Sequence, residues 1–162
     1  MDLYLTDKSK RYYLEALEEV KNCKDDFWDL DEEIEGFLET INKNPLVQTI
    51  YSKYNSTGFT KESYLKFAYS KEVELKLFRT LIPELLICHS DNKNFAELLY
   101  TFSFPDKRDG VLEKDSRLKL RCVDDPDYFY INNIRVAFNS DHKEEHINFW
   151  KDISKKLSEI KK

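Results

Sequence analysis

The pattern of apolar and polar positions predicts helices over the first half of the chain. Its clearest stretch covers residues 24–44, where apolar side chains recur every three or four positions, as one side of an α-helix requires. That side carries Phe27, Leu30, Ile34, Phe37, Leu38 and Ile41. Carboxylates fall on the opposite side, and Asn44-Pro45 is expected to end the helix because proline disfavours helical geometry before it. We therefore predict an amphipathic helix with an acidic outer side.

The same spacing predicts further helices on either side of this one. A first helix is expected over residues 8–22, capped by Thr6, Asp7 or Ser9 and paired with the 24–44 helix as an antiparallel hairpin. The run LIPELLIC at 81–88 is expected to be helical and the most buried part of the chain, with Pro83 kinking or ending a helix. Two more helical segments are predicted at 46–54 and, after a cap at Thr60, at 60–82.

From about Ala96 the pattern changes to alternating apolar and polar residues, which favours strands. Turn-forming residues separate the candidates, with Asn132-Asn133 as a two-residue hairpin turn. The predicted strands are 97–104, 117–123, 128–131 and 134–138. The first of these segments can also be the end of a helix that runs into a strand. After them, Asn139, Ser140 and Asp141 can cap a last amphipathic helix, whose apolar side carries Phe149, Trp150, Ile153, Leu157 and Ile160.

Helices followed by strands indicate an α+β fold. We predict one domain over residues 1–162, because 162 residues are enough for a single hydrophobic core. Its helical part of three to five helices covers about 8–90. An antiparallel meander of three to four strands and the C-terminal helix cover about 96–160.

Composition excludes several function classes. Three glycines leave no glycine-rich phosphate loop, so we predict no nucleotide cofactor of that type and no cofactor overall. The three cysteines lie far apart without metal-site spacing, and no secretory signal precedes them, so a reduced, cytoplasmic protein is expected. No apolar run approaches the length of a membrane span, and no membrane association is predicted.

Charge is distributed unevenly. Residues 1–44 hold 6 Lys and Arg against 13 Asp and Glu, a net −7, whereas the rest holds 20 against 18, a net +2, and together they give −5. Trp28 lies off the apolar stripe of the 24–44 helix, among its carboxylates. Large aromatic residues are enriched at binding hot spots, and acidic surfaces attract basic partners. We predict that the partner-binding residues are Trp28, Asp25, Asp29, Glu32 and Glu33.

A second hypothesis concerns metal binding. The sequence HKEEH at 142–146 matches the H-x-x-E-H pattern of inverted zinc peptidases. On an ideal helix His142 and His146 lie 40° apart, so both are expected on the core-facing side. Zinc catalysis needs a third protein ligand, and the obvious donors are Asp141, His89 and Cys122. The competing interpretation is a pair of neutral histidines, hydrogen-bonded where the helix meets the sheet.

A third hypothesis concerns nucleic acid. Arg117, Lys119 and Arg121 alternate with apolar residues, so one face of that predicted strand is basic, and Arg135 can extend it. Basic residues among aromatics on a sheet are typical of single-strand binding. The net charge of −5 disfavours direct nucleic-acid binding. These bases can instead pair with the chain's own carboxylates.

The sequence resembles no known family closely enough to name one. Small size, an acidic surface and the lack of motifs are typical of immunity proteins, antitoxins and phage-encoded nuclease inhibitors. We therefore predict a non-enzymatic inhibitor that occludes a basic, nucleic-acid-binding protein partner, for example a nuclease. A metal-dependent hydrolase and a nucleic-acid binder are the alternatives.

Overall fold

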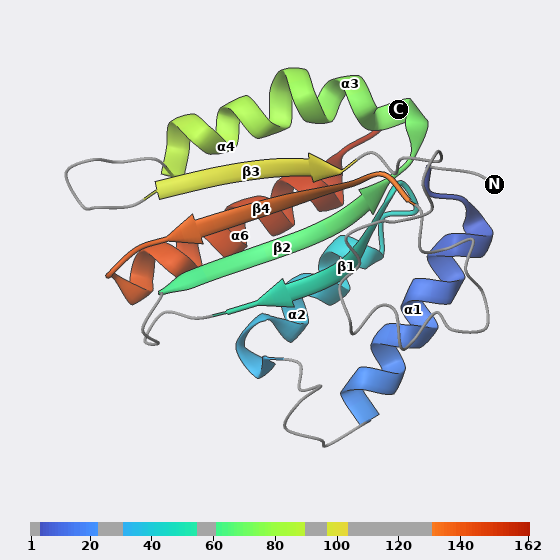
Figure 1. The fold of residues 1–162 in the computed structure, drawn as a ribbon, viewed down its shortest axis with the longest axis horizontal. Coiled ribbons are helices and arrows are strands. Elements are labelled where there is room, and N and C mark those ends of the chain that lie inside the picture. Colours follow the sequence, from blue (N-terminus) through green and yellow to red (C-terminus); the bar gives the residue numbers. More distant parts are fainter. Residues whose placement is uncertain (1–3, 23–30, 55–60, 90–96, 104–130) are drawn as a thin grey trace, which may run out of the picture.

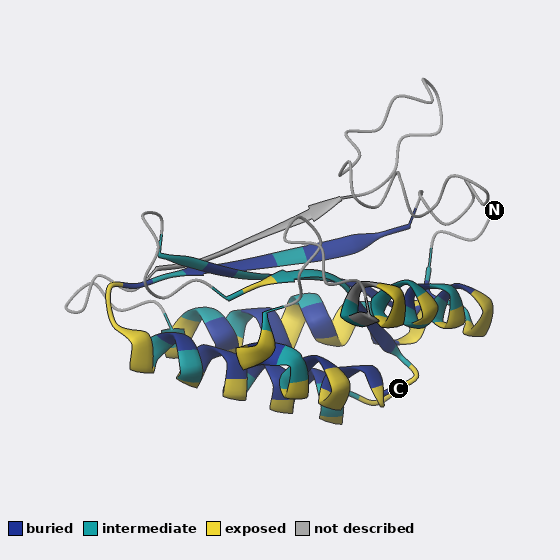
Figure 2. Ribbon diagram, turned by 90° about the horizontal axis from the view of Figure 1, so that it is seen from below, coloured by how far each residue is buried: buried dark blue, intermediate teal, exposed yellow. Residues whose placement is uncertain are grey.

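A computed structural model describes residues 4–22, 31–54, 61–89, 97–103 and 131–162 of the chain (Figure 1). Its centre is a four-stranded antiparallel sheet in the order β1-β2-β4-β3. The strands are β1 Val47–Lys53, β2 Glu62–Tyr69, β3 Glu97–Ser103 and β4 Asn133–Asn139. Most of the helices lie together beneath one face of the sheet (Figure 2). The predicted α+β class is therefore confirmed.

The described helices are α1 Asp7–Asn22, α2 Glu32–Asn42, α6 Lys143–Glu159 and a composite helical run over residues 71–89. That run joins a 3₁₀ turn, Lys71–Val73, to α3, Glu74–Lys76, a π-helical turn, Leu77–Leu81, and α4, Ile82–His89. Among these helices none combines the length and apolar character needed to cross a bilayer.

The strand order places β4 between two strands that precede it in the chain. β1 and β2 form an antiparallel pair, and β2 and β3 both run antiparallel to β4. β2 and β3 are therefore parallel to each other, and the 71–89 helical run forms the crossover between them. This is a split β-α-β arrangement.

The main core lies between the sheet and the helices α2, α4 and α6. Ile34, Leu38 and Ile41 of α2 are fully or almost fully buried there, as the periodicity predicts. α6 contributes Phe149, Trp150, Ile153 and Leu157, and the sheet contributes Leu65, Phe67, Tyr69, Ile134, Val136 and Phe138. A second, smaller cluster of Leu5, Tyr13, Ala68 and Ile131 joins α1 and the N-terminal arm to the sheet.

Two predicted helices are in fact strands. The segment 46–54 contains β1, Val47–Lys53, and the first part of the 60–82 segment forms β2. The start of β1 is buried at three consecutive positions, Val47, Gln48 and Thr49, so the strand lacks the alternation by which strands are recognised. In β2 the alternating residues Ser63, Leu65, Phe67 and Tyr69 are all buried, and this period of two was the signal that the prediction missed.

The strand predictions of the second half have mixed outcomes. Strands at 97–104 and 134–138 are confirmed as β3 and β4. The prediction of a hairpin turn at Asn132-Asn133 is wrong, because Asn133 is the first residue of β4 and pairs with Ala68 and Ser103. The predicted strand 117–123 lies outside the described residues, as does nearly all of 128–131. The helical part at 8–90 therefore also supplies two strands of the sheet.

The helix predicted over LIPELLIC is confirmed, but the prediction of its burial is wrong. Ile82 and Leu85 are buried, whereas Ile87 is 81% exposed and Cys88 is exposed. Pro83 neither ends the helical run nor starts it. The π-helical turn Leu77–Leu81 precedes it directly, and this wider turn relieves the clash that a proline ring makes with the preceding carbonyl groups.

Candidate partner-binding surface

α1 and α2 together form a strongly acidic surface. Residues 15–21 and 31–42 carry eight carboxylates and a single cation, Lys21. We call this the acidic surface, and its members are Glu15, Glu18, Glu19, Asp31, Glu32, Glu33, Glu35 and Glu39. Acids in the first turn of α2 are also favoured by the helix macrodipole, so part of this charge stabilises the helix.

Lys21 holds the two helices of this surface together. Its Nζ donates a hydrogen bond to Glu39 Oε1 at 3.1 Å and lies 3.5 Å from Glu18 and 3.8 Å from Glu35. Burial by itself lowers the pKa of Lys21, but the Glu39 hydrogen bond and the three carboxylate charges outweigh it and raise that pKa. Lys21 is therefore a fixed counter-ion, and Glu18, Glu35 and Glu39 are partly neutralised.

The predicted partner-binding residues divide into two groups. Glu32 and Glu33 are exposed in the first turn of α2, and neither forms an ion pair among the described residues. Asp25, Trp28 and Asp29 lie outside the described residues. Asp31 occupies the N-cap position but accepts a hydrogen bond from the Tyr54 backbone N–H at 2.8 Å, so it ties α2 to the end of β1.

The two histidines of the HKEEH sequence are not on the same side. His142 is the exposed N-cap residue with extended backbone angles, so the helical spacing does not reach it. His146 is fully buried: its Nε2 donates to the Ser140 carbonyl oxygen at 2.8 Å, and its Nδ1 accepts from Ser63 Oγ at 2.8 Å. Both ring nitrogens of His146 are thus engaged in hydrogen bonds within the protein. The prediction of two core-facing imidazoles is wrong.

Metal binding gains no support from the rest of the described chain. No group of three His, Cys, Asp or Glu side chains able to hold a metal ion occurs in it. His89, one of the proposed third ligands, instead bonds Asp152 with its Nε2 at 2.7 Å from Oδ2, and its ring packs edge-on against Phe138 and Phe149. This imidazole stabilises the contact between α4 and α6.

Burial of His146 makes a pH-dependent contribution to stability. Burial lowers the pKa of His146 below its ordinary value, and this outweighs the opposing effects of the Ser140 carbonyl and Glu145. Below about pH 6.5 the unfolded chain therefore binds a proton that the folded chain resists. We expect the free energy of unfolding to fall between about pH 7 and pH 5. Urea unfolding of the wild type and His146→Gln should show a smaller fall for the variant.

His142 provides the control for this effect. His142→Gln removes an exposed imidazole from the same helix end and tests whether the loss of any imidazole gives the same result as His146→Gln. If the free energy of unfolding changes equally with pH in the wild type and in His146→Gln, the pH dependence does not come from His146.

The basic-face hypothesis has only Arg135 within the described residues, because Arg117, Lys119 and Arg121 lie outside them. Arg135 Nη2 contacts Glu62 Oε1 at 2.6 Å, and its guanidinium lies 4.5 Å from the centre of the Tyr64 ring. A carboxylate of the chain itself therefore neutralises Arg135, as the competing interpretation proposed.

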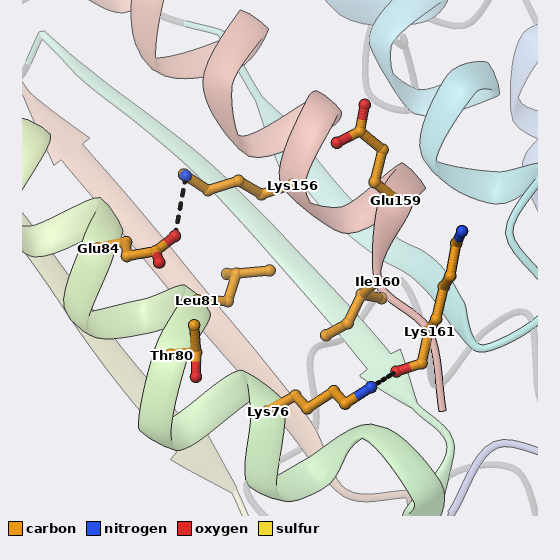
Figure 3. Close-up of a pocket in the computed structure, with 8 residues that line it drawn as sticks. All are labelled: Lys76, Thr80, Leu81, Glu84, Lys156, Glu159, Ile160 and Lys161. Atoms are coloured by element: carbon orange, nitrogen blue, oxygen red, sulfur yellow. Dashed lines mark hydrogen bonds and ion pairs between the residues drawn. The ribbon is translucent and has the colours of Figure 1, made fainter.

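A groove of about 500 Å³ lies between the 71–89 helical run and the end of α6 (Figure 3). Leu81 and Ile160 lie between charged side chains along its sides. Lys156 donates to Glu84 at 3.1 Å, and the Lys76 ammonium donates to the Lys161 carbonyl oxygen. Burial by itself lowers the pKa of Lys156, but the contacts with Glu84 and Asp152 outweigh this effect and raise that pKa. This lysine therefore serves as a charged cross-link between helices.

Comparison with known protein families, curated proteins and solved structures finds no match for this chain. Its function must therefore be argued from its own residues. The acidic surface is the described feature with the most one-sided chemistry. Sequence reasoning found Glu32 and Glu33 but missed Lys21: its spacing from Glu18 was readable as a helical ion pair, whereas its contacts with Glu35 and Glu39 required the packing of two helices.

Proposed function

We propose that this chain is a non-enzymatic binding protein that inhibits a basic, nucleic-acid-binding protein by occupying its binding surface. The observation that carries the proposal is the acidic surface, with eight carboxylates and one lysine across residues 15–21 and 31–42. Such a one-sided charge distribution accelerates encounter with a cationic surface and disfavours nucleic acid itself. Immunity proteins, antitoxins and phage-encoded inhibitors are the functional class that this predicts.

The mechanism assigns different parts to different residues. Glu32 and Glu33 are exposed and carry uncompensated charge among the described residues, so they attract the partner's Lys and Arg side chains. Lys21 restrains Glu35 and Glu39, which keeps that part of the surface rigid before binding. Asp25 and Asp29 add charge, and Trp28 supplies the apolar anchor that salt does not screen. The bound partner loses access to phosphate groups by steric and electrostatic occlusion.

Charge reversal tests this mechanism through the association rate. The double variant Glu32→Lys, Glu33→Lys should slow association about tenfold or more at low ionic strength, with little change in the dissociation rate. The difference should shrink as added salt screens the exposed charges. The measurement is surface plasmon resonance with a partner captured from the native host, over a series of salt concentrations.

A matched control changes the same net charge elsewhere. Glu144 and Glu159 are exposed at the two ends of α6, so the double variant Glu144→Lys, Glu159→Lys separates local from total charge. If both double variants slow association equally, or neither does, the acidic surface is not the binding site.

Trp28→Ala should instead increase the dissociation rate, because it removes an anchor rather than a steering charge.

A further inference from the structure

Gly36 lies in the middle of α2, where a glycine weakens the helix. Glycine loses more conformational entropy than alanine when it is fixed in a helix, so it is among the least favourable residues for a helix interior. The backbone of Gly36 has the ordinary helical geometry of α2, and no left-handed conformation requires a glycine there. The local conformation therefore does not explain this residue.

Packing within the described chain does not explain the glycine either. Gly36 is exposed. Apart from its two chain neighbours and the backbone of α2, no described atom lies within 4 Å of the place that a β-carbon at this position would occupy. A side chain would thus fit there without a clash, and the space above Gly36 is open.

Gly36 is also at the centre of the exposed side of α2. On a helix surface the nearest neighbours of a residue are three and four positions away, with β-carbons about 5–6 Å apart. For Gly36 these neighbours are all exposed, and they are Glu32, Glu33, Glu39 and Thr40. Three carboxylates therefore surround a position that has no side chain.

Two hydrogen bonds fix the turn that follows Gly36. Thr40 Oγ1 donates to the Gly36 carbonyl oxygen at 3.0 Å, so this hydroxyl is directed at the helix backbone. Glu39 Oε1 accepts from Lys21 Nζ at 3.1 Å, which holds its carboxylate in place. The surface beside Gly36 is therefore ordered before any partner binds, which lowers the entropic cost of binding.

We propose that Gly36 is the contact point for an arginine side chain of the basic partner, which lies across α2 with its guanidinium between the surrounding carboxylates. Because no side chain projects from Gly36, the aliphatic part of the arginine can approach the helix backbone. The guanidinium then bonds carboxylates of both adjacent turns. This inference rests on the proposed function, since it concerns the same acidic surface.

Arginine suits this arrangement better than lysine. Its guanidinium is planar and has five N–H donors, so it can lie flat on the helix and bond two carboxylates at once. The ammonium group of lysine is a compact, strongly hydrated charge, and it gains less from a flat surface. Arginine is also enriched among the residues that contribute most to protein interfaces. Gly36 thus gives the acidic surface a preference for arginine.

Binding of two defined peptides to the full chain tests this preference. The probes are a tetra-arginine and a tetra-lysine peptide, both blocked at their ends, which carry the same charge. They are titrated at low ionic strength and followed by amide NMR spectra. We expect the wild type to bind the arginine peptide more tightly, with a shift of the Gly36 amide signal. This signal is readily identified, because the chain has three glycines.

Gly36→Gln should separate binding from stability. It should weaken binding of the arginine peptide about tenfold, the equivalent of one charged hydrogen bond, and leave binding of the lysine peptide nearly unchanged. The same variant should raise the midpoint of thermal unfolding by about 1–3 °C, because glutamine favours a helix more than glycine does. Glutamine adds no charge, so the weaker binding reports the added side chain.

Asn148→Ala is the matched control for the gain in stability. Asn148 is exposed within α6, and alanine there also favours the helix without a change of charge. This variant should raise the unfolding midpoint and bind both peptides as the wild type does. If it also loses affinity for the arginine peptide, helix stability rather than the space above Gly36 controls binding, and the proposal is overturned.

Charge reversal distinguishes a failure of this inference from a failure of the proposed function. If Glu32→Lys, Glu33→Lys weakens binding of the arginine peptide but Gly36→Gln does not, the role of Gly36 is overturned and the acidic surface remains the binding site. If the charge reversal leaves this binding unchanged, the acidic surface is not the binding site and the proposed function fails too. A wild type that binds the two peptides equally, or binds neither, overturns the preference for arginine.

Discussion

Trp150→Ala should lower the free energy of unfolding by about 3–5 kcal/mol. Trp150 is completely buried in the main core, where its ring packs edge-on against Phe149 with centroids 5.5 Å apart. Truncation removes the largest fully buried side chain of the described core and leaves a cavity that α2 and α6 close only partly. Because small domains have about 5–15 kcal/mol of stability, the variant should lose much of its margin. Urea unfolding monitored by circular dichroism measures the effect.

Trp150→Phe should cost much less, for a reason specific to this site. The indole Nε1 of Trp150 is buried without a hydrogen-bond partner among the described residues, and an unpaired buried donor is itself unfavourable. Phenylalanine removes that donor and keeps most of the ring. The exposed neighbour Lys151→Ala, a control on the same helix, should change stability by less than about 0.5 kcal/mol. Equal destabilisation by Phe and Ala at position 150 would show that the N–H contributes a favourable contact.

Asn44→Ala should destabilise the fold by about 3 kcal/mol, because the buried amide of Asn44 forms hydrogen bonds both within its own segment and with the distant C-terminal end of α6. Its Nδ2 donates to the carbonyl oxygens of Leu157 and Ile160, both at 2.9 Å, at the C-terminal end of α6. Its Oδ1 accepts from the Leu46 backbone N–H at 3.1 Å. Asn44 is therefore a side-chain cap for the last carbonyl groups of α6, and alanine leaves them without this donor. Thermal and urea unfolding measure the loss.

Two further variants separate capping from general packing. Asn44→Asp keeps the acceptor for Leu46 but brings a carboxylate against two carbonyl oxygens, so it should be at least as destabilising as alanine. Ser158→Ala removes an exposed hydroxyl that bonds the Lys155 carbonyl at the same helix end, and it should be nearly neutral. A mild Asn44→Asp variant would argue against the capping role.

Helices with a sustained apolar stripe were predictable because the evidence for them is local. The stripes of α2 and α6 each return every three or four residues, and their buried residues match the predicted core side. β1 and β2 were not recognised as strands. Val47, Ile50, Tyr51 and Tyr54 also fit helical spacing, and the choice of a strand depends on pairing partners that a short apolar run does not reveal.

The candidate sites show the same division. Glu32 and Glu33 were predictable because opposite sides of one helix follow from spacing alone, whereas the clamp by Lys21 needed two helices to meet. Within HKEEH, the shared side of the two histidines failed because helix α6 begins at Lys143, one residue after His142. A helix start set one residue later moves a side chain from the core to the surface.

By itself the sequence determined the α+β class, the core sides of α2 and α6, the two strands β3 and β4, and the acidity of the first quarter of the chain. These features depend on residues within a few positions of one another. Only the tertiary structure decided that β1 and β2 join the sheet, that His146 bonds Ser63, and that Asn44 caps α6. The last two contacts join residues 83 and 113 positions apart. Such contacts form when distant segments pack together, and no local pattern records which segments will do so.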